Sequence, residues 1–386
     1  MKKLLFPLSL LTLVVSTVIS CRENQDSEMA TSKASPNNLA NVNNPIVSVP
    51  SKKLSYDEVF ISKESQLIDK NRQKAFAKIA SLNTPFSYQN SLNRSALSNT
   101  GSVIQNDQIV VTSPQKTFIG GVFNSKTIDN LDYSSISYPV KPITVSYSFP
   151  SDFVVDTIER PSLSSMRLSV FKALRAGNFS GEQSLAFDYS MKEYSYYSEL
   201  KIAFGSNINV GNLFGIDISG EKNKVKAKTA IFAKFTQKNF TIDMDMPING
   251  NIFLKESDLE LAKAQNPIYI SSITYGRLGI VSVESNYSYE KVTFALRAAF
   301  TAGIVNGSLQ IDSESEKILK ESNLKTFIVG GRGSDAVKVV EGFSEFSKFI
   351  INGGKFTADV PGVPIYFSAS HASDNSVYFT TYTTNQ

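Results

Sequence analysis

The segment from Lys224 to Met246 alternates between apolar and polar residues almost without a break. A side-chain period of two is that of an extended strand, whose residues point alternately to opposite faces. One side carries Val225, Ala227, Thr229, Ile231, Ala233 and Phe235, and after a change of phase at 237–239 the apolar residues are Phe240, Ile242, Met244 and Met246. The run is far longer than the roughly 5–6 residues of a typical strand. It predicts either a long bent strand in a large antiparallel sheet or a strand that lines a membrane pore.

The composition is that of a folded chain rich in strands. The 386 residues include 16 Tyr and 26 Phe, residue types that favour strands. This length suffices for two or three domains. The formal net charge of +4 is small, and nothing in its distribution points to nucleic acid as a partner.

Enzyme chemistry has little support in the sequence. His371 is the only histidine, which removes most general-base and metal-binding schemes. His371, Ser373 and Asp374 are too close along the chain to form a catalytic triad with one another. The glycine-rich segment 330–333 lacks the lysine and the glycine spacing of nucleotide-binding loops, so it predicts a tight turn or a hinge. We expect neither an enzyme nor a bound cofactor or metal.

The N-terminus has the features of a bacterial lipoprotein signal peptide. Residues 1–20 combine a basic start with an apolar run, and Cys21, the only cysteine, stands where cleavage and acylation would occur. An ordinary secretory signal or a transmembrane anchor is the alternative. Residues 21–53 are rich in Asn, Ser and Pro and predict a flexible tether. The expected location is the outer membrane or cell surface, with release to the outside and insertion into a target membrane as a further step.

The remaining patterns mix helices and strands. Helical periodicity covers 56–82, 163–175, 255–265, 313–323 and 337–351, whereas 185–218 fits a helix as well as a strand. A second alternating run begins at Val292 and ends at Ile304. Strands mixed with helices without strict alternation indicate an α+β fold.

Outside the signal segment the chain has no apolar run of about 18 residues, so it could cross a bilayer only as paired β-strands. On the residues alone, a soluble β-rich surface protein and a pore former both remain open.

Four motifs in order resemble one family. They are Phe118–Val122 followed by Pro142–Pro150, Pro267–Arg277 with Tyr275-Gly276-Arg277 at its end, Phe327–Val329 followed by Gly330-Gly331, and Lys355–Asp359 followed by Pro364–Phe367. Their order and spacing resemble those of the cholesterol-dependent (thiol-activated) cytolysins of the MACPF/CDC superfamily. The resemblance covers about three quarters of the chain.

The resemblance implies an elongated molecule in which a bent, twisted, antiparallel four-stranded sheet is flanked by helical clusters. Residues 54–386 would form this core as three interleaved domains. The clusters, at about 190–219 and 292–323, would each unfold into an amphipathic transmembrane hairpin. Gly330 and Gly331 would release an edge strand, and Tyr275-Gly276-Arg277 would lie near the bend. The implied membrane faces carry Leu200, Ile202, Phe204, Val225, Ala227, Ile231, Ala233, Val292, Phe294, Leu296, Ala298 and Phe300. Of the opening run, Val225 to about Phe235 would enter the bilayer and Phe240–Met246 would stay in the sheet.

The chain also departs from the family. It ends where the family's membrane-recognition domain, domain 4, begins, it has no Trp, and Leu324 stands where an aromatic residue is usual. Cholesterol binding is therefore not implied. The pattern resembles the short component of two-component cytolysin-like systems. That resemblance implies a target bilayer, further copies of the chain, a longer homologous partner and an activating protease as partners. A non-lytic surface-binding or adhesion lipoprotein on the same scaffold is the alternative.

Overall fold

The computed structural model describes residues 102–128, 132–177, 186–306, 309–330, 337–351 and 356–384, and everything below concerns these ranges. The predicted signal peptide, Cys21, the tether and the helix at 56–82 lie outside them. Within these ranges no helix is both long and apolar enough to cross a bilayer.

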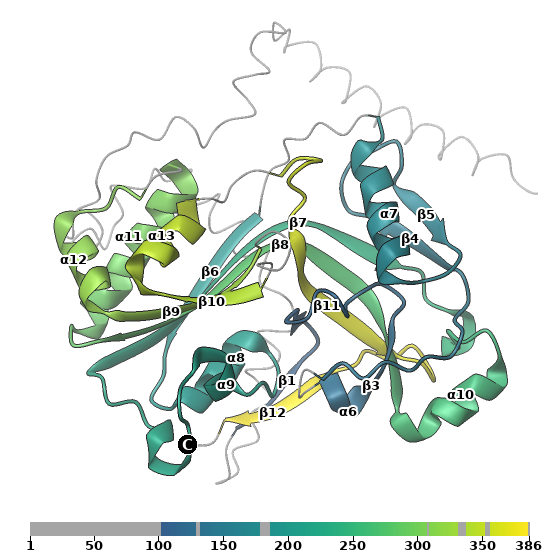
Figure 1. Ribbon diagram of the computed structural model, residues 1–386, viewed down its shortest axis with the longest axis horizontal. Helices are drawn as coiled ribbons and strands as arrows, with labels where there is room; N and C mark the ends of the chain where they lie inside the picture. Colours follow the sequence, from purple (N-terminus) through teal and green to yellow (C-terminus); the bar gives the residue numbers. More distant parts are fainter. Residues whose placement is uncertain are drawn as a thin grey trace, which may run out of the picture. The chain divides into compact units, whose positions relative to one another are not determined.

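The architecture is built on two long antiparallel strands, β7 (Thr229–Met244) and β8 (Pro267–Ser285). They pair from Thr229 opposite Ser285 to Asp243 opposite Ser272, and both are rich in β-branched and aromatic residues, which suit a pleated, half-buried surface. Figure 1 shows that both strands bend midway. They form the centre of a ten-stranded sheet, and the helices around it confirm the predicted α+β class.

One half of the sheet contains five adjacent strands in the order β6-β7-β8-β9-β10. The three further strands are β6 (Ala186–Glu193), β9 (Asn323–Val329) and β10 (Val337–Glu341). Among the described residues β6 pairs only with β7 and β10 only with β9, so these two strands are the edges of this half.

Helices cover both faces of this half (Figure 1). On one face lie α11 (Tyr289–Asn306), α12 (Ser313–Glu321) and α13 (Gly342–Ile351). On the other lie the short helices η2 (Tyr197–Leu200), α8 (Lys201–Phe204), α9 (Val210–Phe214) and η3 (Gly220–Asn223). Alternation along β7 divides its side chains between the two layers. Ile231 and Phe235 pack beneath α11–α13, and Phe232 packs beneath α8 and α9.

The other half of the sheet holds the largest core cluster. Here β8 pairs with β11 (Val363–His371) and β3 (Val122–Asn124), and β4 (Ile143–Tyr147) pairs with β7 and β5 (Val155–Ile158). The remaining elements are β1 (Ser102–Asn106), β2 (Ile109–Val110), β12 (Thr380–Thr384), α6 (Ser125–Ile128), α10 (Glu256–Ala262), η4 (Ile248–Gly250) and η5 (Lys263–Gln265).

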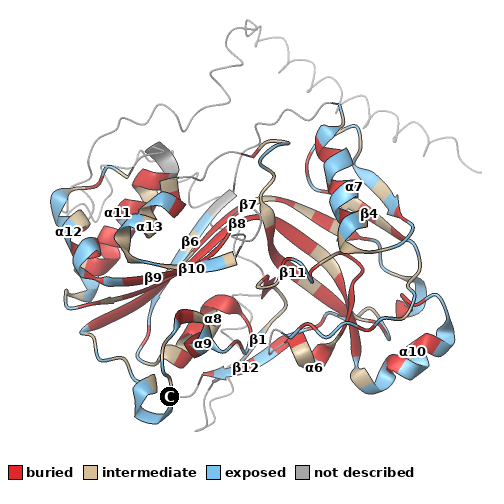
Figure 2. Ribbon diagram, viewed as in Figure 1, coloured by how far each residue is buried: buried red, intermediate tan, exposed pale blue. Residues whose placement is uncertain are grey.

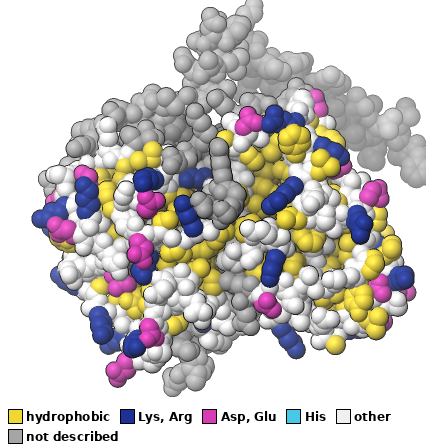
Figure 3. All heavy atoms as spheres, in the orientation of Figure 1, with side chains coloured by type: hydrophobic (Ala, Val, Ile, Leu, Met, Phe, Trp, Pro, Cys, Tyr) yellow, Lys and Arg dark blue, Asp and Glu magenta, His cyan; other side chains and the backbone are white. Residues whose placement is uncertain are grey.

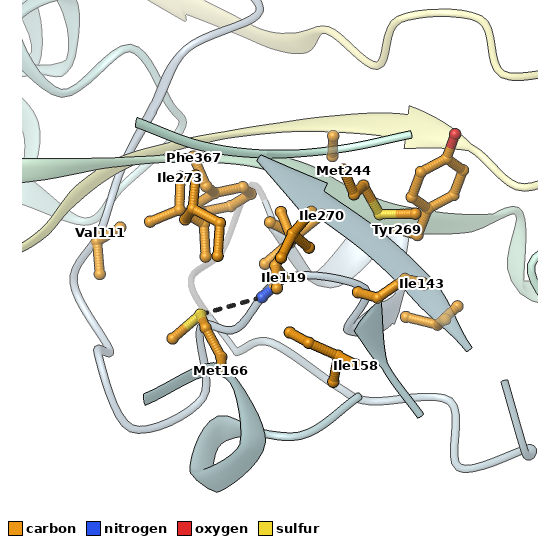
Figure 4. Packing of buried hydrophobic residues seen from close by; sticks show 14 of the residues in the cluster. Val111, Ile119, Ile143, Ile158, Met166, Met244, Tyr269, Ile270, Ile273 and Phe367 are labelled. Carbon is orange, nitrogen blue, oxygen red and sulfur yellow. Dashed lines mark hydrogen bonds between the residues drawn. The ribbon is translucent and has the colours of Figure 1, made fainter. Parts of the chain in front are cut away.

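Helix α7 (Leu163–Arg175) has the bounds predicted from the sequence and packs on this core, and Ser162 caps its first turn together with Ser165. The sulfur of its Met166 accepts a hydrogen bond from the Ile119 N–H within the cluster (Figure 4).

On the face of the molecule that Figure 3 shows, basic and acidic side chains are interspersed over the surface.

The change of phase in the alternating run is a β-bulge. The register of β7 against β8 shifts between Lys238 and Phe240, so Asn239 is the additional residue. A bulge bends its strand and reverses which side chains face the core. The change of phase at 237–239 therefore coincides with this bulge, and Figure 2 shows buried residues along the strand on both sides of it.

Three sequence predictions need correction. Regular pairing of β7 begins only at Thr229, so Val225 and Ala227 precede the strand. Residues 337–341 form strand β10 and not the start of a helix, because pairing with β9 prevails over their weak helical period. The helix expected at 313–323 ends at Glu321, and Asn323 already belongs to strand β9.

Candidate functional site

The candidate site is the half of the sheet covered by helices on both faces. We call Tyr197–Asn223 the first cluster, which joins β6 to β7, and Tyr289–Glu321 the second cluster, which joins β8 to β9. Each cluster thus links two neighbouring antiparallel strands. If either unfolded, its residues could extend both strands as one hairpin. Both links are longer than the roughly 20 residues that two membrane-crossing strands need.

The first cluster packs its apolar residues on one face of the sheet. Leu200 and Phe204 are fully buried, and Ile202 is half-buried beside them. The ring of Phe204 lies edge-on at 5.0 Å from that of Phe327 on β9. Val225 is half-buried against the same layer, and Ala227 is half-buried just before β7.

The second cluster packs on the opposite face. The predicted residues of α11 are all buried there together with two from β7, namely Val292, Phe294, Leu296, Ala298 and Phe300 with Ile231 and Ala233. Phe300 stacks parallel to Phe235 of β7, with 5.9 Å between ring centroids. The alternate residues of 292–300, which were predicted for one side of a strand, thus lie in helix α11. Helices α12 and α13 pack against α11.

Polar atoms without partners lie within and beneath the second cluster. The buried hydroxyls of Thr293, Ser315 and Thr326 have no hydrogen-bond partner among the described residues, nor does Oδ2 of Asp312. A buried, unpaired polar group costs about 1–3 kcal/mol because it has lost its water. The closed arrangement of this cluster is therefore less stable than its apolar packing alone would make it.

Thr326→Val should stabilise the closed arrangement. It replaces the unpaired hydroxyl on β9 by a methyl group of similar size. We expect the free energy of unfolding in urea to rise by about 1 kcal/mol. Thr236→Val is the matched control, since the Thr236 hydroxyl is bonded to the hydroxyl of Tyr366 at 3.0 Å and its loss should destabilise. Equal destabilisation by both variants would contradict the prediction.

An edge unit formed by β10 and α13 closes the site. β10 pairs with β9 from Val337 opposite Val329 to Glu341 opposite Lys325. α13 then packs on α11, where the ring of Phe346 lies 5.7 Å from that of Phe300. The edge unit therefore covers both the free side of β9 and part of the second cluster.

Gly330 and Arg277 lie close together at the end of β9, where the chain leaves β9 before the edge unit begins. Gly330 has a φ of 147°, which favours glycine, and an added Cβ would lie 3.0 Å from Cγ of Arg277. Gly331 lies outside the described residues. The Arg277 guanidinium donates to the Phe349 carbonyl and lies 4.6 Å from the centre of the Phe349 ring. Burial lowers the pKa of Arg277 to about 10, yet the cation holds the end of α13 in place.

Tyr275 and Gly276 face the bulge in β7. The Tyr275 ring stacks on Phe240 at 4.7 Å, and burial raises the pKa of its hydroxyl. At Gly276 a Cβ would lie only 1.9 Å from the Gln237 carbonyl oxygen, so the strands can approach at the bulge only because this residue is glycine. At Gly276 the outer neighbour of β8 also changes from β11 to β9. The motif therefore lies opposite the bulge in β7, at the change of neighbours along β8.

Gly279→Ala should loosen the edge unit. Its Cβ would lie 2.4 Å from Cε1 of Phe349, so α13 would have to shift. Such overpacking costs about 1–3 kcal/mol. We expect faster amide hydrogen exchange in 342–351 and partial recovery when Phe349→Leu is added to make room. Unchanged exchange in the single variant would show that α13 does not depend on this contact.

The comparisons with known proteins agree with this geometry. The family model for thiol-activated cytolysin matches residues 92–385. Pneumolysin of Streptococcus pneumoniae serotype 4 is 30% identical over 252 residues, which are 61% of this chain and 52% of pneumolysin. Perfringolysin O of Clostridium perfringens strain 13 is 28% identical over 210 residues, 52% of this chain and 41% of that protein. The chain thus spans about half the length of the curated relatives it matches.

Solved structures show the same fold. The crystal structure of wild-type pneumolysin has a TM-score of 0.58 at 24% identity, over 72% of this chain and 62% of that one. That of listeriolysin O has a TM-score of 0.56 at 20% identity, over 74% and 63%. The family match covers well over half of the sequence and confirms the predicted resemblance to cytolysins rather than to enzymes. The chain belongs to the thiol-activated cytolysin family.

Proposed function

We propose that this protein is a pore-forming toxin subunit that oligomerises and inserts two amphipathic β-hairpins into a target bilayer. One observation carries the proposal. Each helical cluster joins two neighbouring strands, and the second cluster holds apolar residues at alternate positions although it is helical. A pattern with the period of a strand, stored in a helix, supports a second, extended state.

The strand directions allow copies of the chain to pair in the proposed assembly. Neighbours from β6 to β9 are all antiparallel, so β6 runs antiparallel to β9, as β10 does. Once the edge unit swings away about Gly330 and Gly331, β6 of a second copy can take the place of β10 on β9. The exposed N–H and C=O groups of both edges are then satisfied.

The finer parts of the proposal rest on the family resemblance. They are a lipid anchor at Cys21 or release from it, a longer homologous partner that recognises the membrane, and proteolytic activation within the tether. Binding of cholesterol is not part of the proposal.

Leakage of a dye from liposomes tests the proposal. The purified chain is added with and without a longer homologue from the same source, to vesicles with and without sterol. We expect leakage, and ring-shaped assemblies on the vesicles in electron micrographs, when the required partner is present. Binding without leakage under every condition would overturn pore formation and favour the surface-binding alternative.

A further inference from the structure

Lys325 contacts both the first cluster and the edge unit. It lies on β9, and its side chain is 19% exposed. Its ammonium donates to the Phe214 carbonyl of α9 at 2.8 Å and forms an ion pair with Glu341 of β10 at 3.3 Å. A single, mostly buried lysine on β9 thus contacts two elements, α9 and β10. In the proposed function both elements leave β9, which itself stays in the sheet.

The contact with Phe214 completes the end of α9. The last carbonyls of a helix have no partner within it, and a nearby cation stabilises them. Gly215 ends the helix in a left-handed conformation, so the Phe214 carbonyl points out of the helix toward β9. The Phe214 ring also packs edge-on against Phe204 at 6.1 Å. Lys325 therefore fixes the position of α9 within the first cluster.

The contact with Glu341 depends on the edge strand. Glu341 is the last residue of β10 and lies directly opposite Lys325 in the register of the two strands. Its side chain is 69% exposed, so the ion pair reaches the protein surface. When β10 leaves, the ammonium loses its carboxylate partner, and water reaches it from the vacated edge. Without the Glu341 carboxylate, the Lys325 ammonium is better solvated by water than by the protein alone. It therefore turns toward water, which weakens its hydrogen bond to the Phe214 carbonyl.

Other polar bonds hold the beginning of the first cluster and the residues just before it, and they do not involve the edge unit. The Tyr194 hydroxyl bonds to the Ser282 hydroxyl at 2.7 Å, and the Tyr197 hydroxyl donates to Glu284 at 3.1 Å. Both partners, Ser282 and Glu284, are on β8 and not on β10. The effect of Lys325 should therefore be confined to α9.

We propose that Lys325 couples the edge strand to the first cluster, so that departure of β10 loosens α9 and favours release of the first hairpin after the edge has opened. This inference rests on the proposed function for its purpose. The coupling itself is a property of the closed chain and can be measured without a membrane.

Hydrogen exchange in solution tests the coupling. Glu341→Gln should speed exchange of the amides in 209–216 by about two- to fivefold, the range expected for a partly exposed ion pair. Lys325→Met should have at least the same effect, and the double variant should exchange no faster than Lys325→Met alone. Glu345→Gln is the control, because it removes a carboxylate of the same edge unit that pairs with Lys348 instead.

Two results would overturn the inference. One is unchanged exchange in 209–216 after Glu341→Gln, which keeps Lys325 and is a substitution at an exposed side chain. The other is an additive effect in the double variant, because independent contributions mean that there is no coupling. A chain that shows the coupling but causes no leakage would contradict the proposed function and leave the coupling intact.

Discussion

A disulfide between β9 and β10 should reduce vesicle leakage on the order of 100-fold or more, and a reducing agent should restore it. Thr326→Cys and Val340→Cys place the two cysteines directly opposite each other in the register of the strands. Paired strands bring opposed Cβ atoms near the separation that a disulfide needs. With the edge unit held covalently, β9 has no free side for a second copy, so assembly cannot proceed.

A second pair of cysteines provides the control for this experiment. Ala233→Cys and Val281→Cys lie opposite each other on β7 and β8, two strands that stay paired in both proposed states. This link should leave leakage close to that of the unmodified chain. Full leakage from the oxidised β9–β10 variant would mean that the edge unit need not leave, and the proposed order of events would be wrong.

Ala227→Lys should abolish leakage while leaving folding and assembly on the membrane intact. In the proposed hairpin Ala227 faces lipid, where a lysine costs about 2–4 kcal/mol near the bilayer centre. Every copy in an assembly bears this cost. In the closed chain Ala227 is only half-buried and precedes regular β7, so the closed fold accepts the change. Leakage by the variant at the unmodified rate would show that this face does not enter lipid.

The neighbouring residue supplies the matched control. Lys226 is exposed in the closed chain and lies on the aqueous side of the proposed hairpin. Lys226→Glu should therefore lyse vesicles nearly as well as the unmodified chain. A charge at Ile231 would be a poorer test, because Ile231 is fully buried beneath the second cluster and an unpaired charge there would itself unfold the closed chain.

The features of the fold that are best predicted from the sequence are those set by the spacing of apolar residues within one short segment. The alternating run predicts a long strand that the structure shows as β7, and its change of phase falls at the bulge at Asn239, since side-chain direction follows directly from residue spacing. The α7 helix is predicted because its cap and its apolar spacing lie in one short segment. Residues 337–341 are different: their valines suit a strand or a helix, and only the distant strand β9 decides between the two.

The contacts that hold the site together cannot be predicted from the spacing of residues along the chain. Arg277 and Phe349 are separated by 72 positions, and Lys325 and Phe214 by 111. The family motif draws attention to Arg277 but does not reveal its partner. Nothing local distinguishes Lys325 from other strand lysines, or Thr326 from a threonine with a bonded hydroxyl. These roles arise only when the chain folds.

Helix α11 shows what it means for one segment to satisfy two environments. The residues between its alternating apolar positions include Thr293, Ala295 and Ala299, which are all buried in the closed chain. In the proposed hairpin the same three face water. Large apolar residues would suit the first environment and charged residues the second, but small or weakly polar side chains are tolerated in both. The unpaired hydroxyl of Thr293 then has an explanation as a compromise between two folds, neither of which is optimal for it.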